Sequence, residues 1–169
     1  MRILALCSSL VLATAAANAK SDDYESEAVA DQATLLECIA NNTSDEGTCI
    51  GVISMPCMEE PGGETTVGMV GCSNRELAAW DDLLNARYAQ SMAFYSVTYE
   101  DADLADMQAR QAVRLREAQR AWIALRDADC TYESGMFEGG SLARVVTAGC
   151  RLDHTARRAI WLAPRPEGG

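Results

Sequence analysis

The sequence predicts an all-α protein, a small helical bundle of three longer helices preceded by a disulfide-tied helical N-terminal region. Apolar residues recur at steps of three and four along three long segments, which is the spacing of one face of a helix. No segment shows the sustained apolar–polar alternation that a half-buried strand requires. A third observation, the number of cysteines, indicates how the helices are tied together.

Length and charge define the class of protein and of partner. With 169 residues, 49% of them hydrophobic, the chain is long enough for one hydrophobic core and has a globular composition. Its 25 acidic residues outnumber its 14 basic residues, for a formal net charge of −11. Such a surface repels nucleic acid and anionic lipid headgroups. We therefore expect a cationic protein partner and no nucleic acid.

The first 19 residues have the pattern of a signal peptide. Arg2 provides a positive start, residues 3–17 form an apolar run, and Ala17-Asn18-Ala19 is an A-x-A cleavage site. The run is shorter than the ~20 apolar residues that span a bilayer, and Cys7 lies too early in it for a lipoprotein signal. Cleavage predicts a periplasmic or secreted protein without membrane insertion, beginning at Lys20.

Cleavage leaves six of the seven cysteines, and an even number in an exported chain predicts three disulfides. We expect each bond to join the two ends of a short helix-to-helix connection. The predicted pairs are Cys38–Cys49, Cys57–Cys72 and Cys130–Cys150. Zinc is the alternative, but the chain has no C-x-x-C pair and a single histidine, so we expect no metal and no cofactor.

The region 20–71 is predicted to contain two short helices and a loop. Residues 20–27 are polar and are expected to fray. A helix is predicted over 28–40 from the apolar positions Val29, Ala33, Leu36 and Ala40. A second helix is predicted over 45–58, opened by Ser44 or Asp45 and limited by Pro56. Residues 59–71 are rich in turn formers and predict a loop.

Three longer helices follow. Ser73 and Glu76 form a capping-box pattern that predicts a helix start. The apolar stripe after it comprises Leu77, Trp80, Leu84, Tyr88 and Met92. The next helix is predicted over 101–129, with in-phase residues Leu104, Met107, Leu115, Ala118, Trp122 and Leu125. Ser141 is expected to cap the last helix, and Pro164 begins a flexible tail, residues 164–169. The apolar positions of this helix are Leu142, Val145, Val146, Gly149, Leu152, Ala156, Ile160 and Leu162.

Spaced residues in the longer segments form a family pattern. Cys72, Glu76, Asp81, Leu84-Asn85 and Tyr88 precede LREAQRAWIALRDADC (115–130), GGS and C-R-L-x-x-T-x-x-R-x-x-x-L (150–162). Together they resemble the LprI-like lysozyme-inhibitor family over residues 72–162, with a domain expected at 72–163. The resemblance implies an exported, helical, disulfide-bonded bacterial domain without defined catalytic residues. For the named member of the family it further implies inhibition of lysozyme.

Tryptophans have two interpretations here. Trp80, Trp122 and Trp161 are candidate platforms for carbohydrate stacking. A tryptophan on an apolar helical stripe is more often part of the core. We therefore predict a core role for Trp80 and Trp122.

Two arginines are predicted to set how the helices pack. Arg126 and Asp127 are adjacent, so on a helix they point about 100° apart. We therefore expect Arg126 to pair with Asp81 or Glu76 on a neighbouring helix. Arg158 is likewise expected to form a helix-packing salt bridge.

The sequence offers no defined catalytic site. His154 is the single histidine and does not accompany a G-x-S-x-G motif. Cysteines held in disulfides leave no thiol nucleophile. Any acidic chain offers pairs of carboxylates, so these alone indicate nothing. We expect no enzymatic activity; an enzyme would need turnover that disappears when one particular carboxylate is changed.

Binding is the favoured class of function. C-type lysozymes are typically strongly basic, so an acidic domain is steered toward them. The predicted loop 131–140 lies between Cys130 and Cys150 and offers Tyr132, Met136 and Phe137 for contact and Glu133 and Glu138 for charge. Alternatively, Met136 and Phe137 fold back onto the helices. The loop 59–71 is the second candidate.

The sequence therefore predicts an exported inhibitor of lysozyme or of a related cell-wall hydrolase. The alternative is a periplasmic adaptor or structural domain that binds another envelope protein.

Overall fold

The computed structural model describes the backbone of residues 8–97 and 99–164, and side chains from residue 25 within these ranges. Its elements are α1 (Ser8–Asn41), the 3-10 helix η1 (Glu46–Cys49), α2 (Ser54–Glu59), α3 (Thr66–Phe94), α4 (Ala102–Gly135) and α5 (Leu142–Trp161). Every regular element in the described ranges is helical, which confirms the all-α class. Residues 1–7 of the predicted signal peptide and 165–169 of the predicted tail lie outside the described residues.

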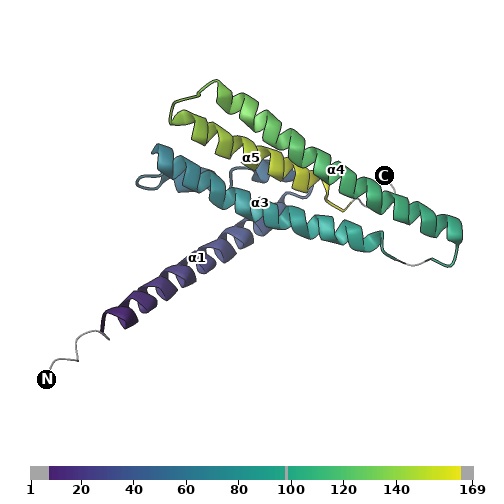
Figure 1. Cartoon of the computed structure of the whole chain (residues 1–169), viewed down its shortest axis with the longest axis horizontal. Helices are drawn as coiled ribbons and strands as arrows, with labels where there is room; N and C mark the ends of the chain where they lie inside the picture. Colours follow the sequence, from purple (N-terminus) through teal and green to yellow (C-terminus); the bar gives the residue numbers. More distant parts are fainter. Residues whose placement is uncertain (1–7, 98, 165–169) are drawn as a thin grey trace.

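Helix α5 is the centre of the bundle (Figure 1). It lies between α3 and α4 and packs against both, whereas α1 contacts α3 with its C-terminal part and extends away from the other helices at its N-terminal part. None of the described helices has an apolar stretch long enough to cross a membrane.

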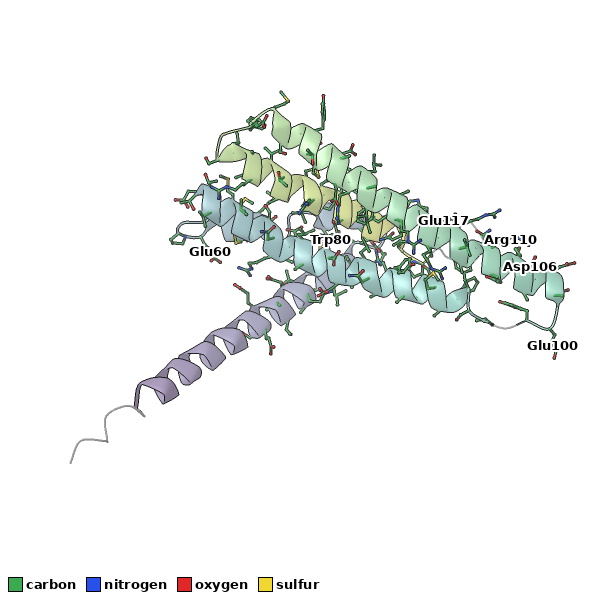
Figure 2. All side chains as sticks on the ribbon, in the orientation of Figure 1. Glu60, Trp80, Glu100, Asp106, Arg110 and Glu117 are labelled. Carbon is green, nitrogen blue, oxygen red and sulfur yellow. A yellow bond between two sulfur atoms is a disulfide. The ribbon has the colours of Figure 1, made fainter. Side chains whose placement is uncertain are left out.

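The hydrophobic core lies between α3 and α5. Trp80 on α3 is fully buried at the middle of the bundle (Figure 2). Ala156 and Ala159 on α5 are also fully buried, and such small side chains leave room for the bulky residues of α3. Leu35 of α1 and Cys49 of η1 complete this core from the N-terminal side.

All three predicted disulfides are present. Cys38–Cys49 joins α1 to η1, Cys57–Cys72 joins α2 to α3, and Cys130–Cys150 joins α4 to α5. The Cα–Cα distances of 5.8, 5.6 and 5.5 Å are those of ordinary disulfides. Each bond therefore ties two consecutive helical elements, as the cysteine spacing predicts.

Helix α3 begins earlier than predicted. The hydroxyl of Thr65 accepts a hydrogen bond from the Gly68 backbone N–H at 3.0 Å and caps the helix, so the turn after α2 covers only residues 60–65. The predicted start at Ser73 is wrong, because Ser73 is buried within α3. The first turn of α3 requires a glycine at residue 68, since a side chain there would collide with the carbonyl of Gly62.

Glu76 makes a buried network instead of a capping box. Its carboxylate accepts hydrogen bonds from the backbone N–H groups of Gly51 (2.6 Å), Ile53 (3.1 Å) and Ser54 (2.7 Å). It also accepts one from the indole N–H of Trp80 at 3.1 Å. Glu76 is 0% exposed, so these four donors replace the water that a carboxylate otherwise requires. The network anchors the segment before α2 to α3.

Two arginines fasten the N-terminal region to α3. Arg87 donates to both carboxylate oxygens of Glu46, at 2.7 and 2.8 Å, and to the Ala159 carbonyl at 2.9 Å. Arg75 donates to both oxygens of Asp31, at 2.9 and 2.7 Å, and these hydrogen bonds raise the pKa of Arg75. Through these pairs α3 holds η1, the end of α5 and α1.

Several N-terminal predictions are wrong in detail. Residues 20–27 belong to α1 instead of fraying. The predicted apolar stripe of α1 faces solvent, with Val29 70% and Leu36 46% exposed, because Leu35 and Asp31 face α3. The predicted helix 45–58 is two short helices separated by residues 50–53, where Gly51 has a φ of 102°. That left-handed conformation interrupts a helix and turns the chain toward Glu76.

Candidate partner-binding surface

The turn between α4 and α5 is the candidate surface, and it is shorter than predicted. Helix α4 continues to Gly135, so Tyr132 and Glu133 lie on its last turn, and the predicted loop 131–140 is helical in its first half. No glycine or proline interrupts α4 before Gly135, and Gly139 turns the chain with a φ of 80°. Ser141 stands at the start of α5, but its side chain makes no capping hydrogen bond, contrary to the prediction.

The five predicted contact residues are at the surface around this turn. Tyr132 is 80% exposed and Met136 81%, so Met136 does not fold back onto the helices. Phe137 is 39% exposed and is the most covered of the three apolar side chains. Glu133 and Glu138 are exposed beside them. The surface therefore combines apolar side chains with negative charge.

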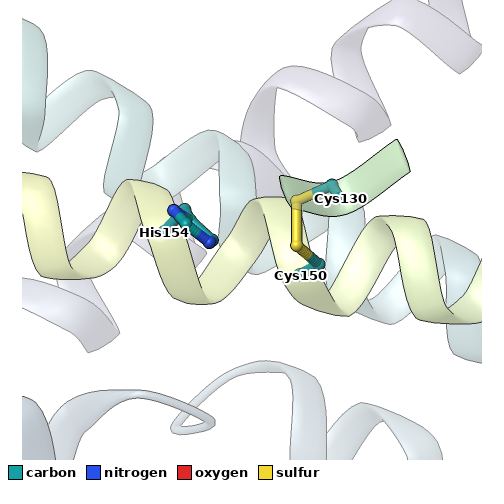
Figure 3. A group of neighbouring side chains, drawn as sticks. All are labelled: Cys130, Cys150 and His154. Atoms are coloured by element: carbon teal, nitrogen blue, oxygen red, sulfur yellow. A yellow bond between two sulfur atoms is a disulfide. The ribbon is translucent and has the colours of Figure 1, made fainter. Parts of the chain in front are cut away.

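The Cys130–Cys150 disulfide joins α4 to α5 within the segment that contains this turn, and Figure 3 shows the bond with His154 beside it. Both cysteines are buried, and His154 follows Cys150 by one turn of α5. The ligand atoms of these three residues lie within 4.8 Å of one another, the spacing of a possible metal site. Both sulfur atoms are bonded to each other, which removes the thiolates that zinc would require. The group acts as a covalent brace for the turn.

Farther from the turn than the disulfide, arginine and tryptophan side chains stack on one another and hold the same two helices together. The Arg158 guanidinium lies 4.5 Å from the centre of Trp161 and 5.8 Å from that of Trp122. Arg126 covers Trp122 at 5.1 Å. Contacts of this kind between a cation and an aromatic ring stabilise helix packing by roughly 0.5–2 kcal/mol each. Trp122 is half-buried against the core, and Trp161 is 53% exposed.

The predicted partners of Arg126 and the predicted salt bridge of Arg158 are not found among the described residues. Arg126 donates to the neighbouring Asp127 at 2.9 and 3.0 Å, because α5 separates α4 from the carboxylates of α3. Arg158 donates to Gln119 at 2.9 Å and forms no salt bridge with the residues that the structure describes, and burial lowers its pKa. The flexible arginine side chain can bend back toward a neighbour that the ideal helix angle separates from it.

A separate apolar groove lies at the opposite end of α5. It has a volume of about 660 Å³ and opens between α3, α4 and the end of α5. Its aromatic lining consists of Phe94, Tyr95 and Trp161. The second predicted contact loop is reduced to the turn 60–65, which carries the exposed Glu60 and Glu64. Neither feature adjoins the α4–α5 turn in the chain.

Glu76, Arg87 and Asp31 are buried charged residues that stabilise the fold, and the predicted helix faces include none of them in the core. A signal for two of them exists, because Glu76 and Arg87 are in helical phase with Trp80 and Leu84. A charged residue on an apolar stripe indicates a buried polar network.

The fold and this surface define a small helical disulfide-bonded domain that presents a braced, exposed turn. The lysozyme inhibitor LprI family matches residues 57–162, which is more than half of the chain. The chain belongs to this family. The match begins at Cys57, so it also includes the second half of α2 and both cysteines of the Cys57–Cys72 disulfide, whereas the sequence motifs begin at Cys72.

One similar protein is an uncharacterized protein of Rhizobium meliloti (strain 1021), 33% identical over 94 residues. The alignment covers 54% of this chain and 66% of the relative, just under two thirds of its length. No solved structure matches the chain.

Proposed function

We propose that this chain inhibits lysozyme and that the α4–α5 turn makes the contact. Membership of the lysozyme inhibitor LprI family carries the proposal, since it names the activity and the class of partner. The geometry supports the turn as the contact, because its apolar side chains are exposed and its base is braced by a buried disulfide.

The turn has the features of a binding anchor. Interfaces gain most of their affinity from a few large side chains that enter a pocket of the partner. Tyr132, Met136 and Phe137 are such side chains on a short, clipped segment. A segment that is already ordered loses less conformational entropy when it binds. The cleft of an enzyme is a suitable partner for a protruding turn of this kind.

Charge supports a basic partner. The formal net charge of −11 attracts a basic lysozyme, and Glu133 and Glu138 place part of that charge beside the apolar anchors. Attraction between opposite charges raises the association rate and weakens as salt rises. Inhibition is therefore expected to fall with increasing ionic strength.

We further propose that the protein acts in the periplasm or outside the cell after removal of residues 1–19. The A-x-A pattern at Ala17–Ala19 supports cleavage there. Three disulfides support an oxidising compartment, because such bonds are rare in the cytosol.

The inhibition test uses the purified protein and a basic c-type lysozyme acting on peptidoglycan. Phe137→Ala and Tyr132→Ala are each expected to raise the inhibition constant by about tenfold, the effect of removing one strong anchor. Glu138→Gln is expected to have a smaller effect that disappears at high salt. Met107→Ala, on the same helix but far from the turn, is the matched control and should leave inhibition unchanged. Absence of inhibition by the unmodified protein at micromolar excess and low salt would refute the proposal.

The brace gives a second test. Replacing Cys130 and Cys150 together by serine is expected to lower the free energy of unfolding by about 3 kcal/mol, because the bond closes a loop of 20 residues. Inhibition should weaken in conditions where circular dichroism still shows a folded protein, since the turn is then less ordered before binding. Full inhibition by a folded double variant would show that the brace serves stability alone.

A further inference from the structure

A second apolar face runs along α4 and packs against nothing in the described chain. Its residues follow one another at steps of three and four, the spacing of a helix-to-helix contact. They are Ala118, Ala121, Leu125, Ala128, Tyr132 and Met136. All six are exposed, including Leu125 at 56% and Tyr132 at 80%. We call these six residues, together with the exposed Gly135, the outer stripe.

The outer stripe is distinct from the face that packs on α5. The residues that face α5 include Trp122, Arg126 and Cys130. Trp122 contacts Arg158 of α5, and Cys130 is bonded to Cys150 of α5. Arg126 covers the ring of Trp122. Leu125 precedes Arg126 by one residue and so points about 100° away from it. The periodicity of α4 therefore contains two stripes, of which α5 covers one. The predicted single stripe mixed them, because it included both Trp122 and Leu125.

The order of large and small residues in the outer stripe is self-complementary. Ala121, Ala128 and Gly135 recur every seven residues, while Leu125 and Tyr132 lie between them. Suppose that two copies of α4 pack antiparallel, with the twofold axis between residues 126 and 127. Leu125 of one copy then lies opposite Ala128 of the second copy. The same axis places Tyr132 opposite Ala121 of the second copy. Each large side chain thus meets a small one, which allows close packing without collision.

We propose that the outer stripe is the interface of an antiparallel dimer of this chain. A closed dimer uses the same surface on both subunits, so its large residues must face its own small residues across the twofold axis. The outer stripe meets this requirement, and we therefore assign a second copy of the chain as its occupant. The stripe spans 118–136, about 28 Å of helix. One helix pair of this length falls at the low end of specific interfaces, below about 1,200 Å² in total, so the dimer is weak and reversible.

Charge gives the dimer a distinctive salt dependence. Two copies that each carry a formal net charge of −11 repel one another, and salt screens that repulsion. Dimerisation therefore strengthens with ionic strength, whereas the proposed inhibition of a basic lysozyme weakens. Tyr132 and Met136 belong to both surfaces, so the dimer and the lysozyme complex exclude each other.

Sedimentation velocity of the purified protein without lysozyme tests the proposal. The expected result is a concentration-dependent shift from monomer to dimer with a dissociation constant on the order of 10 µM, lower at high salt than at low salt. Leu125→Ser is expected to weaken the dimer by at least about tenfold. Ile123→Ser is the matched control, because Ile123 is 41% exposed on the same helix but outside the stripe, and it should dimerise normally.

A charge-pair experiment tests the antiparallel register. Ala121→Glu and Tyr132→Lys should each abolish self-association. An equimolar mixture of the two should recover it, because the introduced carboxylate of one variant then faces the introduced ammonium group of the other. A monomer at all concentrations and salts, or a dimer unaffected by Leu125→Ser, would overturn the proposal. So would a mixture that stays monomeric. Inhibition of lysozyme by the unmodified protein, measured at concentrations well below the dimer dissociation constant, tests the proposed function independently of these outcomes.

Discussion

Replacing Glu76 by alanine is expected to lower the free energy of unfolding by about 5 kcal/mol. The change leaves three backbone N–H groups, those of Gly51, Ile53 and Ser54, and the Trp80 indole N–H without an acceptor in a site that is closed to water. Each unpaired buried donor costs roughly 1–3 kcal/mol. Urea unfolding followed by circular dichroism measures the change.

Glu76→Gln keeps the volume of the side chain and gives a milder test. One amide oxygen still accepts hydrogen bonds, whereas the amide NH₂ faces donors, so we expect roughly half the effect of alanine. Asp82→Ala is the matched control, an exposed carboxylate on the same helix, and should change stability by less than about 0.5 kcal/mol. If Glu76→Gln unfolds at the same urea concentration as the unmodified protein, the buried network does not stabilise the fold.

Replacing Arg87 by alanine is expected to cost about 4 kcal/mol. The change leaves the Glu46 carboxylate without its bidentate partner and the Ala159 carbonyl without its side-chain donor. Removing one member of a buried ion pair is far more harmful than removing both, because the remaining charge stays desolvated. The double variant Arg87→Met with Glu46→Leu should therefore be more stable than Arg87→Ala.

The matched control for Arg87 is an exposed pair. Arg110 bonds to Asp106 one turn earlier, near the N-terminal end of α4 (Figure 2), and Arg110 and Asp106 are 54% and 70% exposed. Arg110→Ala should cost less than about 0.5 kcal/mol, since water screens such pairs. Equal losses for Arg87→Ala and Arg110→Ala in urea unfolding would contradict the role assigned to the buried pair.

Local patterns in the sequence predict the helices, but not which face of each helix is buried. The stripe Leu77–Trp80–Leu84 of α3 is correct at Trp80 and Leu84, because one apolar face there meets one neighbour. In α1 and α4, apolar residues occur on two faces of the helix, and only one of these faces packs against the bundle. Leu36 and Leu125 are consequently exposed, although both lie on periodic stripes.

The partners of charged residues are also not predicted by the local sequence pattern. The helix angle predicts that Arg126 reaches across to α3, but its partner is the adjacent Asp127. The angle between neighbours on an ideal helix applies to Cβ atoms, and the long arginine side chain is not confined to that direction. The candidate contact residues are a better case: Tyr132 is exposed because it lies on the face of α4 that α5 does not cover, and Met136 because it follows the last residue of that helix.

The all-α class and the three disulfides can be predicted from the sequence, since helical periodicity and cysteine spacing are properties of short segments. Three features are visible only in the folded chain: α5 lies between α3 and α4, Glu76 and Arg87 are buried, and α4 keeps an uncovered apolar face. These features depend on contacts between residues far apart in the chain. Their energies come from burial and desolvation, which no local pattern contains.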